Sequence, residues 1–481
     1  MTTKTPRATP PRSAAPTAAD FDPLLVLFNT RRYAELESRV RGLLVTYPNA
    51  PFAWQLLGGA LQMQGKDALA AFQKVAELSP LDAGAQFNLG VAFKSAGQLE
   101  QAVLSYRRAL ALNAHYVEAL SNLGNVLQDL GQLEEAVRCY RQALVIRPHA
   151  VDTHNNLGTA LKELGQLDAA MQCYRRAIQL KPDYADAHYN LGNVLKGLGQ
   201  LEEAVRCYRQ ALRIHPHFAK AHSNLGSALK DLGNLNEAIR HFQRAVEIDP
   251  LYAEAHNNLG CTLKDAGQFD AALTSYRRAL EINPDLAEAH SNLLFYLKHS
   301  ETIDAQTLFT EHLRFAEKFE VPLQADWQPH NNSRNPERIL QVGFVSGDFC
   351  NHAVAHFFEL VVKHLAQYPQ LSLHAYYNHT VEDSVTQRLR GYMAHWHPIA
   401  GLSDEALAQK IRTDGIDILY DLSGHTALNR LPVFARKPAP IQVSWMGYPG
   451  TTGLSAMDYY QSDRFLLPED RFDAQFTEKI V

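Results

Sequence analysis

The chain has 481 residues, of which 46% are hydrophobic and 20% charged, and its formal net charge is −5. This length predicts more than one domain, because single cores rarely grow past about 250–300 residues. The small negative charge argues against a general basic surface for nucleic acid or anionic lipid, and no stretch approaches the roughly 18–20 apolar residues that span a bilayer.

The N-terminus and the cysteines indicate where the protein resides. Residues 1–20 are rich in Pro, Thr and Ala and contain no apolar signal core, so they predict a disordered tail. Cys139, Cys173 and Cys207 recur every 34 residues, which places them in equivalent positions of successive units. Stacked helices lie about 8–10 Å apart, too far for a disulfide. We therefore expect free thiols and a cytoplasmic location.

A period of 34 residues dominates the first 300 positions. The triplet Asn-Leu-Gly starts at residue 88 and returns every 34 residues up to residue 258, and an Ala followed four residues later by Tyr or Phe keeps the same step. This pattern is typical of the tetratricopeptide repeat, a pair of helices that cannot bury its apolar face alone. The sequence predicts an α-solenoid, a superhelix of stacked pairs, over residues 21–299.

One position of the first helix in each pair carries an amide. An Asn amide can both donate to and accept from a peptide backbone, and units about 10 Å apart would meet an extended peptide at about every third residue. The alternative is that Asn is simply a feature of such repeats. The predicted peptide-binding residues are Asn88, Asn122, Asn156, Asn190, Asn224 and Asn258, with Asn292 at the same position of the last unit.

The periodicity changes after residue 299. Residues 300–337 predict a helical connector (303–320) and a polar linker, and residues 338–481 predict alternating strands and helices. The expected strands are 339–345, 371–377, 416–422 and 440–445; the expected helices are 352–365, 381–394 and 403–412. Such alternation predicts a Rossmann-like α/β lobe with a parallel sheet, whose ligands lie beyond the carboxyl ends of the strands.

Polar, glycine-containing turns follow three of these strands. They are Ser346–His352, Ser423–Thr426 and Met446–Gly453. Turns of this kind can hold phosphate or sugar oxygens, helped by a helix N-terminus. None matches the dinucleotide fingerprint or the P-loop, and plain connecting turns are the alternative.

The turns, in this order behind these repeats, resemble the O-linked N-acetylglucosamine transferase and SPINDLY family. The stretches that carry the resemblance are GFVSGDFCNH at 343–352, DGIDIL at 414–419 and PAPIQVSWMGYPGT at 438–451. The resemblance implies a two-lobed glycosyltransferase of the GT-B type that inverts the sugar carbon, uses no metal and modifies Ser or Thr of proteins. The absence of an Asp-x-Asp motif after the tail agrees with a metal-independent reaction.

The resemblance also implies roles for individual residues. The active-site His falls on His352 and its acidic partner on Asp348, while a His of the last repeat falls on His290. A positioned base would let the acceptor hydroxyl lose its proton, and either His352 or Asp348 can be that base. The alternatives are a helix cap for His352 and an ordinary repeat histidine for His290. The implied donor-binding residues are Asn351, Thr426, Arg430, Met446, Gly447 and Pro449.

Two departures leave the donor open between UDP-N-acetylglucosamine and GDP-fucose. Val354 stands where the family often has Thr, and the turn Gly424–Thr426 with its His425 is more similar to the SPINDLY branch. A repeat scaffold without catalysis is the third hypothesis. The chain stops where the family begins a second lobe, so the resemblance implies that this chain alone is nearly inactive. Expected partners are extended protein acceptors, a sugar nucleotide and, through the repeats, a second copy.

Overall fold

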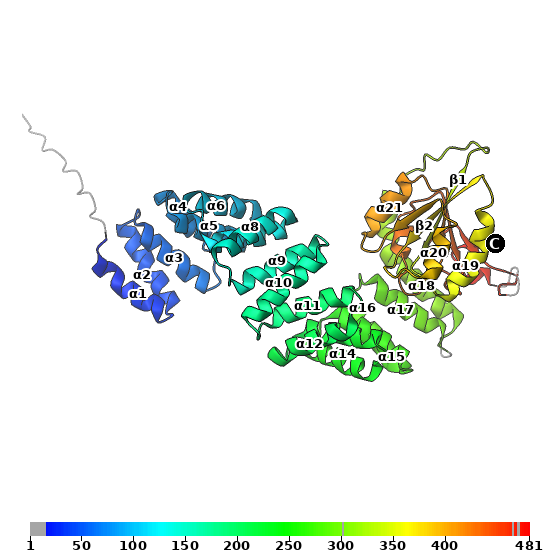
Figure 1. The fold of residues 1–481 in the computed structure, drawn as a ribbon, viewed down its shortest axis with the longest axis horizontal. Helices are drawn as coiled ribbons and strands as arrows, with labels where there is room; N and C mark the ends of the chain where they lie inside the picture. Colours follow the sequence, from blue (N-terminus) through cyan, green and yellow to red (C-terminus); the bar gives the residue numbers. More distant parts are fainter. Residues whose placement is uncertain (1–15, 301–302, 464–465, 469–471) are drawn as a thin grey trace, which may run out of the picture. The chain divides into compact units, whose positions relative to one another are not determined.

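The computed structural model describes residues 16–300, 303–463, 466–468 and 472–481. It separates into two compact units, residues 1–221 and 222–481, with helix α13 (Ala219–Asp231) crossing the boundary. Each unit is described by itself (Figure 1). Within the described ranges, no helix is long and apolar enough to cross a membrane.

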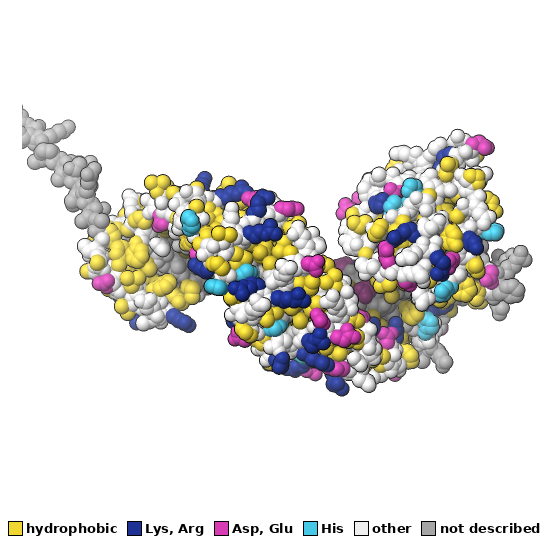
Figure 2. Space-filling model, in the orientation of Figure 1, with side chains coloured by type: hydrophobic (Ala, Val, Ile, Leu, Met, Phe, Trp, Pro, Cys, Tyr) yellow, Lys and Arg dark blue, Asp and Glu magenta, His cyan; other side chains and the backbone are white. Residues whose placement is uncertain are grey.

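The first unit consists of antiparallel helix pairs. The helices are α1 (Ala18–Asn29), α2 (Tyr33–Thr46), α3 (Pro51–Met63), α4 (Leu69–Leu78), α5 (Ala83–Ser95), α6 (Leu99–Leu112), α7 (Val117–Asp129), α8 (Leu133–Ile146), α9 (Val151–Glu163), α10 (Leu167–Leu180), α11 (Ala185–Gly197) and α12 (Leu201–Ile214). Figure 2 shows side chains of both charges distributed over the visible face of the repeats.

Helix α1 begins at Ala18, with a capping box formed by Thr17 and Asp20, so the prediction of a disordered tail is wrong for residues 18–20. Residues 1–15 lie outside the described ranges.

The repeat pattern has a direct packing cause. In each pair the Gly of the Asn-Leu-Gly triplet lies under the aromatic ring of the second helix. A Cβ added at Gly124 would come within 2.6 Å of Tyr140, and one at Gly158 within 2.7 Å of Tyr174. Tyr140 and Tyr174 have no exposed surface. The pair is therefore a matched set, in which glycine makes room for a ring that fills the space between helices.

The second unit continues the pairs and adds a sheet. Its helices before the sheet are α14 (Leu235–Ile248), α15 (Ala253–Asp265), α16 (Phe269–Ile282), α17 (Ala287–Lys298) and α18 (Ala305–Phe319), followed by the 3-10 helix Val321–Asp326. The strands are β1 (Leu340–Ser346), β2 (Leu371–Tyr377), β3 (His395–Pro398), β4 (Ile418–Asp421), β5 (Ile441–Trp445), β6 (Tyr459–Gln461) and β7 (Lys479–Ile480). Helices α19 (Ala353–Leu365), α20 (Ser384–Arg390), α21 (Asp404–Thr413) and α22 (Leu431–Phe434) connect them.

The sheet is wholly parallel, in the order β3-β2-β1-β4-β5-β6-β7. Successive residues of β1 enter different cores: Phe344 packs with Phe358 of α19, whereas Val345 packs with Ile411 of α21. Helices α19 and α21 therefore cover opposite faces (Figure 1). Leu294 of α17 and Phe315 of α18 join the core on the α21 face, so the last repeat and the connector are part of this lobe.

The α-solenoid followed by an α/β lobe confirms the predicted fold class, and four predicted strands lie within two residues of the observed ones. Three short strands were not predicted. They are β3, β6 and β7, each of two to four residues at or near a sheet edge, and too short to show a periodic pattern. The five cysteines are free, as expected.

Candidate functional site at the carboxyl edge of the sheet

Strands β2 and β3 are added on one side of β1, and β4 to β7 follow on the other side. The strand order therefore changes direction between β1 and β4, which are hydrogen-bonded neighbours. In open parallel sheets a crevice forms beyond the carboxyl ends of such strands. Three turns lie at this edge, residues 347–352 after β1, 423–430 after β4 and 446–453 after β5. We call them the exit turns.

Glycines allow the exit turns to touch one another. A Cβ at Gly347 would come within 2.5 Å of the Leu428 Cβ, and one at Gly424 within 2.3 Å of the Tyr448 Cβ. A Cβ at Gly447 would lie 2.1 Å from the carbonyl oxygen of Leu422. Each contact joins a turn to its neighbour, so the three segments form one surface, although the first and the last are about 100 residues apart in the chain.

His352 is the N-cap of α19. Its Nδ1 accepts a hydrogen bond from the Val354 backbone N–H at 3.3 Å and lies 3.7 Å from a carboxylate oxygen of Asp348. The His352 side chain is 49% exposed, whereas that of Asp348 is 17% exposed. The structure therefore combines the two readings of His352: it caps the helix and also adjoins the acid.

Asp348 occupies a partly desolvated position. Burial raises the pKa of its carboxyl, although the neighbouring His352 and His379 oppose that shift. Its backbone N–H donates to the Ser346 hydroxyl at 2.9 Å, which fixes the turn. A carboxylate of raised pKa is a better proton acceptor than a solvated one.

Three of the predicted donor-binding residues already form hydrogen bonds within the protein. The Asn351 N–H donates to Asp383 at 2.6 Å, and the Thr426 hydroxyl donates to the Ser423 carbonyl at 2.8 Å. Arg430 donates to the Leu402 carbonyl at 2.6 Å and lies 3.3 Å from Asp404. Its guanidinium holds the turn after β4 against the segment before α21, a structural duty that the sequence did not predict.

The turn after β5 is the most constrained. Met446 has a φ of +66°, in the left-handed region that side chains rarely adopt. The next residue, Gly447, has no room for a side chain. Pro449 lines a cavity of about 310 Å³ that also contacts Phe309 and His312 of α18. Gly447 is thus required by the close approach of this turn to the backbone at the end of β4.

His290 lies on α17 and packs against the rings of Phe315 and Phe319 of α18, with centroids 5.4 and 6.1 Å away. Burial lowers the pKa of His290 to about 4. Among the described residues, no hydrogen bond or ion pair joins His290 to Asp348 or His352. Its catalytic role stays a prediction.

Two further buried histidines tie the helices to the exit turns. His312 of α18 donates from Nδ1 to the Leu308 carbonyl at 2.8 Å, so its Nε2 accepts from the Tyr448 hydroxyl at 2.9 Å. His425 donates from Nε2 to the Thr452 carbonyl at 2.9 Å, and its Nδ1 accepts from Ser291 of α17 at 3.1 Å. Both rings are neutral in this arrangement, and burial lowers the pKa of His312 to about 4 and that of His425 well below its usual range.

Two buried carboxylates at the exit turns were missed by the sequence reasoning. Asp421, at the end of β4, accepts from the N–H groups of Ser423 and Gly424 at 3.1 and 2.8 Å, and burial raises its pKa to about 6. Glu478 accepts from the Thr451 hydroxyl at 2.6 Å and the Thr452 N–H at 2.7 Å. In the sequence, Asp421 is recognisable only as an acidic residue at the end of a short strand, and Glu478 only as an acidic residue directly before one.

The repeat asparagines of the first unit are partly buried, and two of them form hydrogen bonds to the preceding repeat. Asn156 donates from its amide to Asn125 at 3.0 Å, and Asn190 donates to Asn155 at 3.0 Å. Each bond runs from one repeat to the preceding one and orients the amide, leaving its second N–H for another partner. Asn88 and Asn122 are also partly buried.

In the second unit the same position shows the same bond. Asn292 donates to Asn257 at 3.0 Å, and Asn258 and Asn224 are partly buried. The amides are thus held by the repeats themselves, as expected of a repeat feature, and still present donor and acceptor atoms at regular intervals.

Comparison with known proteins identifies both parts of the chain. Residues 283–481 match the model of glycosyl transferase family 41, and residues 92–131, 124–165, 158–199, 185–218 and 217–285 match tetratricopeptide-repeat models. The chain therefore consists of tetratricopeptide repeats and a glycosyl transferase family 41 domain, and it is similar to O-GlcNAc transferase and SPINDLY proteins. Its α/β lobe accordingly corresponds to one lobe of the GT-B fold.

Individual relatives agree. The chain is 35% identical over 177 residues to the probable UDP-N-acetylglucosamine–peptide N-acetylglucosaminyltransferase SPINDLY of Arabidopsis thaliana, which covers 36% of this chain and 19% of that protein. It is 34% identical over 146 residues to the UDP-N-acetylglucosamine–peptide N-acetylglucosaminyltransferase of Caenorhabditis elegans, covering 30% and 12%. The matches therefore span less than one fifth of these relatives. The structure of an O-GlcNAc transferase mutant from Thermobaculum terrenum superposes with a TM-score of 0.58 at 35% identity, covering 62% of this chain and 56% of that one.

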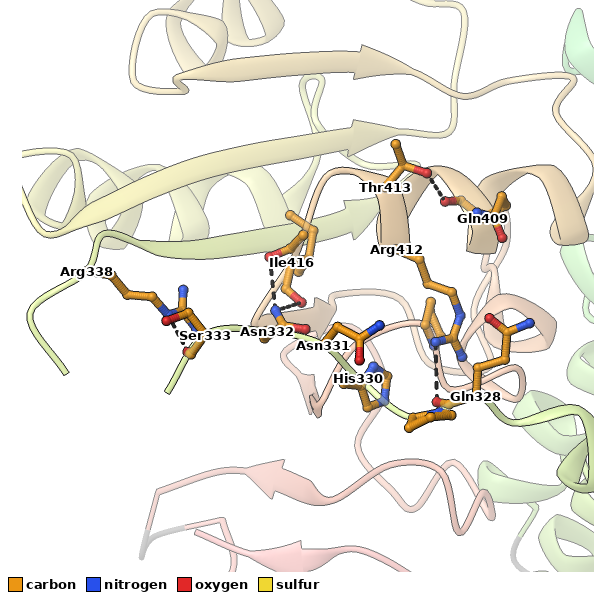
Figure 3. A pocket seen from close by; sticks show the side chains of 13 residues that line it. Gln328, His330, Asn331, Asn332, Ser333, Arg338, Gln409, Arg412, Thr413 and Ile416 are labelled. Atoms are coloured by element: carbon orange, nitrogen blue, oxygen red, sulfur yellow. Dashed lines mark hydrogen bonds between the residues drawn. The ribbon is translucent and has the colours of Figure 1, made fainter. Parts of the chain in front are cut away.

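The family 41 domain also has a hollow at the opposite, amino-terminal edge of the sheet. It measures about 410 Å³ and is lined by the linker residues 328–333 together with Arg338 and Arg412 (Figure 3). Arg412 donates to the carbonyls of Arg436 and Lys437 at 3.2 and 2.7 Å. Its donors are thus directed to the protein's own backbone.

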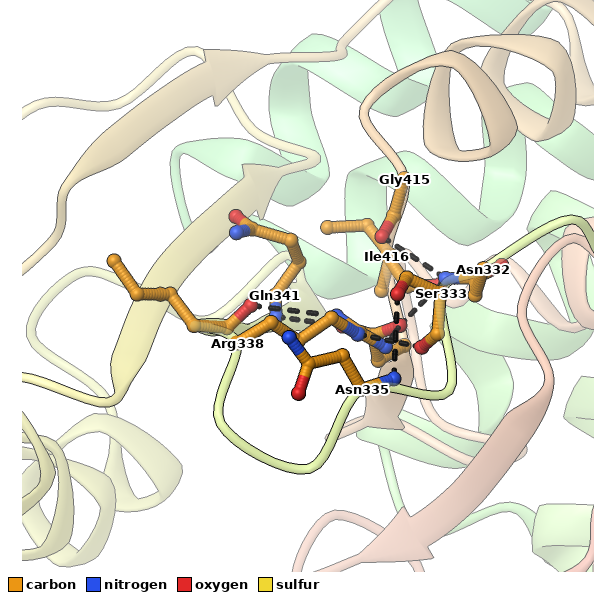
Figure 4. Close-up of polar contacts among 9 residues, drawn as sticks. Asn332, Ser333, Asn335, Arg338, Gln341, Gly415 and Ile416 are labelled. Carbon is orange, nitrogen blue, oxygen red and sulfur yellow. Dashed lines mark hydrogen bonds and ion pairs between the residues drawn. The ribbon is translucent and has the colours of Figure 1, made fainter.

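The second arginine of this hollow is also occupied. Arg338 forms an ion pair with Asp417 and donates to the Ser333 carbonyl at 2.6 Å, while Asn332 donates to Asp417 at 2.6 Å (Figure 4). Burial alone would raise the pKa of Asp417, but the hydrogen bonds from Arg338, Gln341 and Asn332 lower it overall. This edge fastens the linker to the sheet, and we do not assign the donor to it.

Proposed function

We propose that this chain is the repeat arm and first catalytic lobe of a protein O-glycosyltransferase, which moves N-acetylglucosamine from UDP-N-acetylglucosamine to Ser or Thr of proteins bound along the repeats. The observation that carries the proposal is the exit edge itself. Three glycine turns meet at the switch point of a parallel sheet, with Asp348 3.7 Å from His352.

The geometry favours Asp348 as the proton acceptor. Because His352 Nδ1 accepts from the Val354 N–H, a neutral His352 carries its proton on Nε2. That N–H can donate to the acceptor hydroxyl oxygen or to a sugar oxygen and orient it. Asp348, whose carboxyl pKa is raised by burial, would then take the hydroxyl proton as the oxygen attacks the sugar carbon and the diphosphate leaves.

A single displacement of this kind inverts the sugar carbon, and we propose it without a metal. The N-terminus of α19 is the group that would face the anionic donor, because several backbone N–H groups of the exit turns, among them those of Asn351, Gly424 and Thr452, already donate within the protein. This scheme does not need a pair of carboxylates to hold a catalytic metal.

The buried position of His425 bears on the choice of donor sugar. His425 has no exposed surface and lies against α17 and α18 rather than at the exit surface. It therefore cannot contact the sugar, and its similarity to the SPINDLY branch offers no physical reason for GDP-fucose. We propose UDP-N-acetylglucosamine as the donor.

Protein acceptors are proposed to lie along the repeat asparagines, and the five free cysteines support a reducing compartment such as the cytoplasm. Self-association through the repeats stays a prediction.

The test is a transfer assay on the protein as the cell makes it, with UDP-N-acetylglucosamine and GDP-fucose supplied separately. Asp348→Asn should lower kcat by about 10²–10⁴-fold, the range for general base catalysis, with normal folding. His352→Asn is the matched control for the helix cap, because Asn also caps helices well and lacks the imidazole.

If His352→Asn transfers sugar as fast as the unaltered protein, then His352 is only a cap. Transfer from GDP-fucose alone would overturn the donor, and transfer from neither sugar nucleotide by an intact folded protein would favour the scaffold hypothesis.

A further inference from the structure

A cluster of metal-ligating side chains lies away from the exit turns. His374 of β2, His397 of β3 and Asp414, the C-cap of α21, bring three ligand atoms within 4.8 Å of one another. They come from three separate elements on the face of the sheet that α21 covers. Nothing in the proposed transfer reaction uses them.

Two of the three distances within the cluster are close to those between the ligands of a four-coordinate transition metal. The His374 Nδ1 lies 3.2 Å from the His397 Nε2, and the His397 Nε2 lies 3.7 Å from the Asp414 Oδ2. Ligands that sit about 2.0–2.1 Å from a tetrahedral Zn²⁺ ion are about 3.4 Å from one another. Two imidazole nitrogens and one carboxylate oxygen are a ligand set that Zn²⁺ and its neighbours accept.

The surroundings orient these ligands. His374 Nε2 lies 2.9 Å from the Gln341 Oε1, which can only accept, so the proton of the ring sits on Nε2 and the lone pair of Nδ1 points toward His397. The Tyr376 hydroxyl donates to Asp414 at 2.7 Å. Partners of this type, which fix the tautomer and rotation of metal ligands, are typical of metal sites.

A metal ion could reach the cluster from solvent, and one lysine would compete with it for the carboxylate. His374 is buried, but the His397 and Asp414 side chains are each 17% exposed, so an ion can reach the cluster from solvent. Lys410 lies 3.0 Å from the Asp414 carboxylate and is the cation that competes with a metal. Its side chain is 35% exposed and can swing away.

We propose that His374, His397 and Asp414 form a structural binding site for a divalent transition metal of the Zn²⁺ class. A water would complete the coordination. The ion would fasten the edge strands β2 and β3 to helix α21, and it takes no part in sugar transfer.

The experiment titrates the tag-free chain with Co²⁺, whose visible absorption reports tetrahedral coordination, and then with Zn²⁺ in competition. The unaltered protein should show one such site. His397→Ala and Asp414→Asn should each weaken binding at least about 100-fold, since each removes a direct ligand. Both substitutions are at partly exposed positions.

Two further variants make the result specific. Lys410→Met should tighten binding about tenfold or more, because it removes a positive charge beside the ion. His364→Ala, an exposed histidine of α19, should leave the titration unchanged.

As a second readout, Zn²⁺ should raise the Tm of the unaltered protein and of His364→Ala but not of Asp414→Asn. Absence of the tetrahedral Co²⁺ spectrum in the unaltered protein, or equal spectra in all variants, would overturn the proposal. The three side chains would then be linked only by their own hydrogen bonds and ion pair.

Discussion

Two glycines of helix α11 illustrate how the same residue serves opposite purposes. A Cβ at Gly192 would come within 2.7 Å of the Tyr208 ring, which is fully buried and cannot move aside. A Cβ at Gly197 would meet nothing within 4 Å. The first glycine is required by packing, whereas the second is only an exposed residue in the last turn of the helix.

This difference makes a matched pair of substitutions. Gly192→Ala should lower the free energy of unfolding by about 1–3 kcal/mol, because an overpacked core must shift. Gly197→Ala should raise it by up to about 1 kcal/mol, because Ala is the better helix former. Urea denaturation followed by circular dichroism measures both. Equal effects of the two substitutions would contradict the packing account of the repeat pattern.

Gly447 tests the exit turns at the same scale. An added Cβ would lie 2.1 Å from the backbone oxygen of Leu422, so Gly447→Ala must displace either the turn after β5 or the end of β4. We expect the affinity for the proposed sugar nucleotide to fall at least tenfold. Gly450→Ala is the control. A Cβ added at Gly450 would first meet the Cε1 atom of the Tyr448 ring, at 3.2 Å, and its three nearest atoms all belong to that ring rather than to the backbone. Equal donor affinity in both variants would show that the turn does not shape the donor site.

At the scale of elements, three neutral histidines lie where the last repeat, the connector and the lobe meet: His312 and His425 form hydrogen bonds across this junction, and His290 packs between α17 and α18. Ser291 donates to His425, and Tyr448 donates to His312, only while the accepting nitrogens carry no proton. Their folded-state pKa values lie below the ordinary value of 6.5, about 4 for His290 and His312 and well below 6.5 for His425.

The sign of the pH dependence follows. Between about pH 4 and 6.5 the unfolded chain binds more protons at these histidines than the folded chain, so the free energy of unfolding falls as the pH falls through this window. The loss should be roughly 1–3 kcal/mol each for His290 and His312, and His425 adds to it in the same direction. Denaturation of the chain at a series of pH values, followed by tryptophan fluorescence, measures it.

His290→Phe is the control for this window, because it keeps the ring contacts with Phe315 and Phe319 but cannot titrate. The slope of stability against pH should be shallower in this variant. An unchanged slope would exclude His290 from the acid response.

The repeat amides lead to a prediction about acceptor binding. Asn156→Ala together with Asn190→Ala should raise the KM for a protein acceptor severalfold and leave kcat nearly unchanged, because these residues bind the acceptor away from the reacting atoms. Asp183→Ala, in an exposed turn of the same repeats, should change neither constant. A fall in kcat without a change in KM would contradict an acceptor-binding role.

At the scale of the whole molecule, the chain forms two compact units that divide inside the repeat array rather than at the junction with the lobe. Repeats depend mainly on their neighbours, so a local defect should destabilise its own unit first. Trp54 is in the first unit, and Trp327, Trp396 and Trp445 are in the second. Fluorescence of a Trp54→Phe chain therefore reports the second unit alone.

In that background, Gly192→Ala should lower the urea midpoint measured by far-ultraviolet circular dichroism and leave the fluorescence midpoint within error. A common shift of both signals would show that the units unfold as one.

The sequence alone determined the repeat array, the parallel sheet and the positions of the exit turns, because each follows from local rules. Glycine must sit under a ring, proline ends a helix, and apolar runs separated by helices make parallel strands. The pairing of Asp348 with His352 was also accessible, since the two are four residues apart in one turn.

Only the tertiary structure decided the rest. The burial of His425, the ties that occupy Arg430 and the cluster of His374, His397 and Asp414 each depend on segments that are distant in the chain and meet only after the sheet and helices have packed. Polar side chains of this kind follow no periodic pattern, because their partners are chosen by the folded geometry and not by their neighbours in sequence.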